Sequence, residues 1–166
     1  MMDERNALFT DQTLARAIAF IWREAELLDR RDYRAWLDLW DPKGHYVVPI
    51  DPRTTDYAST LNYAYDDHHM RELRVQRMTS GFSASASDAA RTVRTVSRFT
   101  LSGDSADLVE VKSSQIVIAY KRGLSTIFAA DLTHKIDMSS GEPRLSEKVI
   151  RLIDSTEALS AIGFLL

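Results

Sequence analysis

The sequence contains no cysteine among its 166 residues. This absence excludes disulfide bonds, a thiol nucleophile, a cysteine-ligated zinc site and any iron–sulfur cluster held by this chain. Histidine is scarce as well, so few imidazole groups are left for metal binding or acid–base chemistry. The four histidines are His45, His68, His69 and His134.

An excess of basic charge is also absent. The chain carries 21 lysine and arginine residues against 24 acidic ones, for a formal net charge of −3 and an isoelectric point near 5.8. This balance favours neither a nucleic-acid groove nor an anionic membrane surface. The longest apolar runs are about six residues, far short of a membrane span, and the acidic start has no apolar secretory segment. We therefore expect a soluble cytoplasmic protein with no nucleic-acid or membrane partner.

The length and composition fit one domain over residues 1–166, which is long enough to bury a stable core without disulfide bonds. Apolar residues recur at helical spacing between Leu14 and Leu28 and predict a first helix, with Thr10 as its N-cap. A second, short helix is predicted to begin after Asp32 and to end before a proline and a glycine.

The second half of the chain alternates with the period of β-strands. Residues 45–50 form a short strand at an edge or end of a sheet, since it contains a proline, and residues 51–65 form a long loop. Four longer strands joined by short turns are predicted at 92–101, 107–120, 124–138 and 144–154. Strands of this length twist and curl. The predicted fold is therefore α+β and cone-shaped, with the N-terminal helices packed in the concave face of one strongly curved antiparallel, or mixed, sheet.

Five segments carry a family resemblance when they are taken in order. They are EAELLDRRDYRAWLDLW (24–40), HYVVPID (45–51), YDDHHMRELRVQRM (65–78), ARTVRTVSRF (90–99) and the apolar tail GFLL (163–166). In this order and spacing they resemble the small (β) subunit of the Rieske-type aromatic-ring-hydroxylating dioxygenases. That family is a branch of the cone-shaped nuclear-transport-factor-2-like fold, and the resemblance covers nearly the whole chain.

The resemblance implies a non-catalytic, structural subunit of a multicomponent oxidoreductase of aromatic compound catabolism. It also implies that this chain carries no cofactor, because in that family the large (α) subunit holds the 2Fe–2S cluster, the mononuclear iron and the substrate pocket. The missing cysteines agree, since a Rieske cluster needs two cysteines besides two histidines. The implied partner is the large subunit, in a trimer of αβ pairs. Self-association of this chain as a trimer is a further alternative.

The segment Asp66, Asp67, His68 and His69 has the residue types of a two-histidine, one-carboxylate iron site. Adjacent side chains on a helix point about 100° apart, so the two histidines would not converge on one ion. We therefore interpret the segment as the start of a helix over about residues 66–78, with Asp66 as the N-cap and Asp67 near the positive end of the helix dipole.

The alternative function is a stand-alone enzyme of the same fold, of the isomerase, dehydratase or cyclase type, acting on a hydrophobic ring compound. Its candidate acid or base is His134, which lies on the apolar face of a strand and is expected to point into the cone. Its candidate partners are Tyr46, His45 and Asp38. Tyr46 and His45 point to opposite faces of one strand, so only one of them can line a pocket. In a structural subunit, His134 would instead be a hydrogen-bonded core residue.

Some residues are also candidates for contact with a partner. Trp36 and Trp40 belong to an aromatic stripe at helical spacing, which is either core or, in part, a partner surface. Arg94 and Arg98 lie in a locally basic segment, which we interpret as ion-paired with neighbouring carboxylates. The apolar tail 162–166 is expected to dock, either on its own sheet or on another subunit. The interface candidates are Trp36, Trp40, Arg94, Arg98, Phe164, Leu165 and Leu166.

Overall fold

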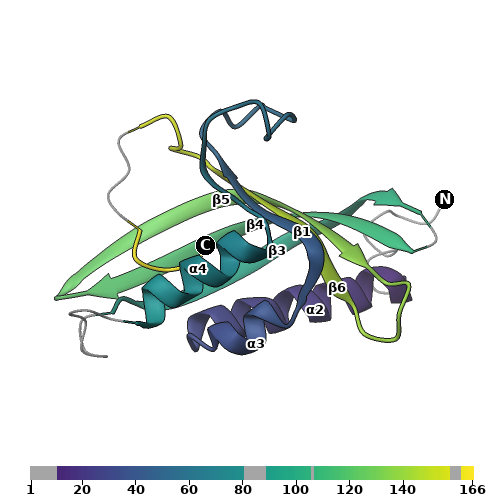
Figure 1. Cartoon of the computed structure of the whole chain (residues 1–166), viewed down its shortest axis with the longest axis horizontal. Coiled ribbons are helices and arrows are strands. Elements are labelled where there is room, and N and C mark those ends of the chain that lie inside the picture. The colour runs from purple at the N-terminus through teal and green to yellow at the C-terminus, as the bar shows by residue number, and fades with distance from the viewer. Residues whose placement is uncertain (1–10, 81–88, 106, 158–161) are drawn as a thin grey trace.

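A bent six-stranded sheet with helices on its concave side forms the fold (Figure 1). The computed structural model of the chain describes residues 11–80, 89–105, 107–157 and 162–166. The helices are α2 (Gln12–Asp29), α3 (Tyr33–Leu37) and α4 (His68–Thr79). The strands are β1 (Trp40–Pro49), β2 (Asn62–Asp66), β3 (Arg91–Asp104), β4 (Leu108–Lys121), β5 (Leu124–Asp137) and β6 (Arg144–Leu152).

The sheet has the strand order β2-β1-β6-β5-β4-β3. Strands β3 to β6 form the predicted antiparallel meander, and β1 joins it by pairing in parallel with β6. Of the two positions predicted for residues 45–50, the edge is wrong, because β2 pairs with the other side of β1 and takes the edge itself. The other alternative, an end, holds, because Pro49 is the last residue of β1. Sequence periodicity misses β2 because a five-residue strand is too short to show a clear alternation. The sheet is therefore mixed, and it does not close on itself.

The helices fill the hollow of the sheet from two ends. Helix α2 packs against β3 and β4, and α4 packs against β1 and β2. The apolar stripe of α2 is buried as predicted, with Ala17 and Ile21 no more than 1% exposed. Asp11 caps this helix by accepting hydrogen bonds from the backbone of Thr13 and Leu14, whereas the predicted cap, Thr10, lies outside the described residues. None of the helices described is long and apolar enough to cross a membrane.

The second predicted helix is shorter than expected. Helix α3 ends at Leu37, and Trp40 is already the first residue of β1. The two tryptophans therefore do not share a helical face. Instead, Trp36 and Trp40 meet edge to face in the core, with ring centroids 5.4 Å apart, and Tyr46 contacts both of them. Three aromatic rings thus fix the junction between α3 and β1.

Gly44 lies in β1 beside the backbone of β6, and its replacement by alanine is our first test of the fold. A Cβ atom there would stand 2.7 Å from the carbonyl oxygen of Leu145 and 3.0 Å from the Trp40 ring. We expect Gly44→Ala to lower the free energy of unfolding by about 1–3 kcal/mol, as overpacking does. Denaturant unfolding measures the change. The matched control is Gly141→Ala, because a Cβ at Gly141 meets no atom within 4 Å. Equal losses in the two variants would contradict the expectation.

Candidate functional site

A buried carboxylate, that of Glu24 on α2, forms the centre of a charged cluster inside the cone. Its Oε1 accepts hydrogen bonds from Lys148 Nζ at 2.8 Å and from Trp36 Nε1 at 3.0 Å. Its Oε2 lies 3.3 Å from His134 Nε2. The four side chains come from α2, α3, β5 and β6, and each is at most 1% exposed. The cluster therefore joins two helices to the middle of the sheet.

The electrostatic environment of the cluster determines the protonation states of Glu24 and His134. Burial by itself would raise the pKa of Glu24, but the charge of Lys148 and the hydrogen bond from His134 outweigh it and hold that pKa well below its usual range. Burial lowers the pKa of His134, so its imidazole is neutral at pH 7. A neutral imidazole facing an ionised carboxylate donates its Nε2 hydrogen to it. Glu24 is therefore ionised, and the Nε2 hydrogen of His134 is used in the hydrogen bond to its carboxylate.

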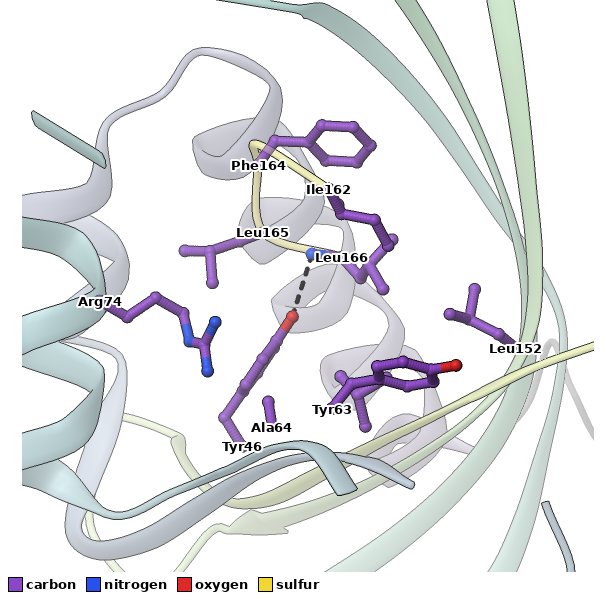
Figure 2. Close-up of a pocket in the computed structure, with 10 residues that line it drawn as sticks. Tyr46, Tyr63, Ala64, Arg74, Leu152, Ile162, Phe164, Leu165 and Leu166 are labelled. Atoms are coloured by element: carbon purple, nitrogen blue, oxygen red, sulfur yellow. Dashed lines mark hydrogen bonds between the residues drawn. The ribbon is translucent and has the colours of Figure 1, made fainter. Parts of the chain in front are cut away.

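A cavity of about 220 Å³ lies at the mouth of the cone, between β1, β2, α4 and the segment 162–166 (Figure 2). Tyr46 lines it, and its hydroxyl accepts a hydrogen bond from the backbone nitrogen of Leu166 at 3.0 Å. Burial raises the pKa of Tyr46 to about 12, so the phenol stays protonated at neutral pH. Arg74, also in the wall, forms an ion pair with Asp66. The polar groups of this cavity thus bond to the protein itself.

The four residues considered for a stand-alone enzyme do not form one site. His134 and Tyr46 both point inward, but His134 does not line the cavity at the mouth, whereas Tyr46 does. His45 lies on the other side of β1, where it stacks on Tyr65 with ring centroids 5.0 Å apart. Asp38 is exposed at the end of α3 and does not enter the cone. Within the described ranges, no hydrogen bond or ion pair joins His134 to any of the other three.

The segment from Asp66 to His69 leads into α4, as predicted, but the predicted N-cap is wrong. Asp67, rather than Asp66, is the N-cap, because its side chain accepts a hydrogen bond from the backbone of Met70 at 2.9 Å. Asp66 ends β2 instead and is buried against Arg74. The described part of the chain contains no group of three or more ligating side chains that could hold a metal ion. With no cysteine in the sequence either, these residues do not fit a Rieske cluster.

The interface candidates lie mostly inside the chain. Trp36 and Trp40 are core residues, and Arg94 is buried in an ion pair with Asp29 at 2.8 Å. Of the predicted tail, Leu165 and Leu166 are buried against this chain's own residues, and Phe164 packs edge to face on Phe128. The tail thus docks on its own chain, one of the two alternatives considered. Arg98 is the exposed member of the set, and it pairs loosely with Asp131 at 3.4 Å.

The sequence analysis missed Glu24 and Lys148, although each leaves a signal. Glu24 follows Ile21 by three residues and precedes Leu28 by four, so it falls on the apolar stripe of its helix. Lys148 alternates with Ile150 and Leu152 and therefore faces the core. Two opposite charges on the apolar faces of two elements are the signal of a buried ion pair.

A second surface was missed on the convex side of the sheet, on β3, β4 and β5. We call it the outer apolar face. Val93, Ile118 and Ile127 stand side by side in one cross-strand row and are 68%, 46% and 64% exposed. The signal in the sequence is the run IVIAY at 116–120, which is apolar on both faces of its strand. The face consists of Val93, Ile116, Ile118, Tyr120 and Ile127.

Breaking the buried ion pair tests the cluster. Lys148→Met leaves the Glu24 carboxylate without its cation, so we expect a loss of about 3–5 kcal/mol in the free energy of unfolding. The double variant Glu24→Gln/Lys148→Met removes both charges, and we expect it to be more stable than Lys148→Met. Denaturant unfolding of the single and double variants measures both effects. A double variant less stable than Lys148→Met would contradict the role of the pair.

The pH dependence of stability tests His134. Its pKa is lowered from the ordinary value of 6.5 in the folded chain, so only the unfolded chain takes up a proton just below that pH. Stability should therefore fall as the pH drops from 7 to 5.5, with His134 contributing up to about 1.4 kcal/mol per pH unit. We expect His134→Gln to flatten this slope and the exposed control His69→Gln to keep it. An unchanged slope in His134→Gln would rule out the neutral buried imidazole.

Several known proteins with similar sequences or structures are subunits of dioxygenases. The small subunit of anthranilate 1,2-dioxygenase from Acinetobacter baylyi is 31% identical over 120 residues, which cover 69% of this chain and 74% of that protein. The β subunit of biphenyl 2,3-dioxygenase from Rhodococcus jostii is 30% identical over 156 residues, or 85% and 81% of the two chains. The β subunit of benzoate 1,2-dioxygenase from Burkholderia mallei has the same fold, with a TM-score of 0.76 at 21% identity over 93% of this chain and 97% of that one.

The family match agrees with the order of the sequence segments. Residues 23–157, most of the chain, match the family described as ring hydroxylating beta subunit. Four of the five segments that carry the resemblance lie wholly or largely within this range. The resemblance inferred from the sequence is therefore confirmed. The chain belongs to the ring hydroxylating beta subunit family.

Proposed function

We propose that the chain is the structural β subunit of an aromatic-ring-hydroxylating dioxygenase of aromatic compound catabolism and braces an iron-containing large subunit. The named relatives are small or β subunits of such dioxygenases. The 2Fe–2S cluster and the mononuclear iron are assigned to the large subunit, in keeping with a chain that has no cysteine. The cytoplasmic location stays a prediction.

The observation that carries this proposal is the contrast between the two sides of the sheet. On the concave side, the polar groups of Glu24, His134 and Lys148 bond to one another and are at most 1% exposed. A substrate has no access to them, which disfavours a stand-alone enzyme. On the convex side, the outer apolar face is open to contact. A buried polar cluster on the concave side and an exposed apolar face on the convex side favour a role in assembly over a role in catalysis.

The outer apolar face has the anatomy of a protein interface. Its central rows, around Ile118 and Ile116, carry no charge. At one end it is bordered by Arg98 and Asp131, and at the other by Arg91 beside Tyr120. An apolar centre with a polar rim, enriched in tyrosine and arginine, is typical of a contact between proteins.

We assign this face to contact with a neighbouring copy of the chain in a trimer of αβ pairs. In a ring of three, each copy contacts the next through a heterologous interface, and an uncharged apolar face can pack against the neighbouring surface without electrostatic repulsion. The rim carries charges of both signs, Arg98 and Asp131, so that two copies can also pair at their edges. Contacts between copies at this face would tie neighbouring αβ pairs into one ring, which is the bracing role proposed here.

The test is co-production of the chain with a candidate Rieske large subunit, followed by native mass spectrometry. We expect the wild-type chain to yield a complex of three large and three small subunits. Ile118→Asp places a charge in the middle of the outer apolar face, where its burial would be costly. We expect this variant to lose the full complex and to give single αβ pairs.

The matched control is Ile153→Asp, at an apolar side chain that is 77% exposed but lies outside the outer apolar face. We expect this control to assemble as the wild type does. Full assembly of Ile118→Asp would show that the copies meet elsewhere. A chain that forms no complex with the large subunit and turns over a small molecule alone would overturn the proposed function.

A further inference from the structure

Residues 162–166 lie inside the cone, on the same side of the sheet as the helices (Figure 1). Leu165 and Leu166 are 1% and 3% exposed, which is as buried as the core of the sheet. Gly163, two residues earlier, is exposed. The segment therefore enters the interior within a few residues, and its last two side chains become part of the core.

Three polar side chains bind the backbone of this segment. Tyr46 on β1 accepts a hydrogen bond from Leu166 N at 3.0 Å, as Figure 2 shows. Lys148 on β6 donates to the backbone oxygen of Leu166 at 2.9 Å. Arg94 on β3 donates to the backbone oxygen of Leu165 at 3.1 Å. These contacts recognise a peptide backbone, with one donor and two acceptors, rather than any particular side chain.

The two cations are held ready for this role by carboxylates of helix α2. Lys148 lies 2.8 Å from Glu24, and Arg94 lies 2.8 Å from Asp29. Both cationic side chains are 1% exposed. A buried cation that is already oriented by a carboxylate loses little freedom when it binds a carbonyl oxygen. The site is thus built by α2, β1, β3 and β6, independently of the segment that occupies it.

We propose that residues 162–166 act as an intramolecular peptide ligand, and that the site formed by Tyr46, Arg94 and Lys148 binds a short apolar peptide segment. The covalent link raises the effective concentration of the segment, so the site is filled in cis. Phe164 adds an apolar contact, edge to face on Phe128 at 5.4 Å. The bound segment separates the cavity at the mouth from the Glu24 cluster, because Leu166 borders the cavity and contacts Lys148.

This inference goes beyond the role as a subunit, and binding in trans tests it. We compare the full chain with a chain that ends at residue 161, with and without a synthetic peptide of residues 162–166. We expect the shortened chain to melt at a lower temperature and the peptide to restore the loss in a saturable way. A control peptide with Leu165→Ser and Leu166→Ser should restore nothing. An unchanged melting temperature on shortening, or equal effects of both peptides, would overturn the proposal.

A second measurement needs no shortened chain, because the sequence has no cysteine and an introduced thiol is the single one present. Leu165→Cys places the thiol in the buried site, and Gly163→Cys places it in an exposed position two residues away. We expect the buried thiol to react with a maleimide at least about tenfold more slowly under native conditions. Equal rates would mean that the segment does not occupy its site in solution, and would overturn the proposal.

The contribution of Arg94 can be isolated in the same assay. We combine Leu165→Cys with Arg94→Met, which removes the donor to the backbone of Leu165. The matched control is Arg98→Met, an exposed arginine on the same strand. We expect faster labelling with Arg94→Met alone, without loss of the near-ultraviolet circular dichroism of the folded chain. Labelling that is equally fast in both variants would contradict backbone recognition by Arg94.

Discussion

The ion pair between Glu24 and Lys148 is the interaction on which the interior depends. It joins the first described helix to the last strand, across 124 positions of sequence. Taking two charges out of water is costly, and the cost is offset only where further donors satisfy the carboxylate. Trp36 and His134 are those donors, so α3 and β5 are drawn to the same point. One arrangement of helices and sheet satisfies the whole group.

The same pair links the core to the segment 162–166, because Lys148 also donates to Leu166. In the interior of the cone, Glu24, His134, Lys148 and Leu166 thus form one connected group of hydrogen bonds. The convex side of the sheet differs, since its apolar rows are exposed. This difference between a closed interior and an open outer face is the feature on which the proposed structural role depends.

Much of the fold could be predicted from local pattern. Strands β3 to β6 alternate over many residues and are joined by short turns, so that their boundaries and antiparallel order follow from periodicity. Strand β2 could not be found this way, because five residues are too few to show a clear alternation. Its assignment as a strand depends on its pairing with β1, which lies elsewhere in the sequence. The same limit explains Asp66. It resembles a helix cap in the sequence, but its partner Arg74 and its position in the sheet make it the end of a strand.

The sequence by itself determined the class of the protein: a cysteine-free α+β chain whose ordered segments mark the ring hydroxylating beta subunit family. It also determined that His134 faces inward, because strand alternation is a local property. Only the tertiary structure decided that His134 meets Glu24 and Lys148, and that Leu166 docks on its own chain. These contacts depend on sheet register and on the bend of the sheet. Both arise from packing between distant segments, which no local periodicity encodes.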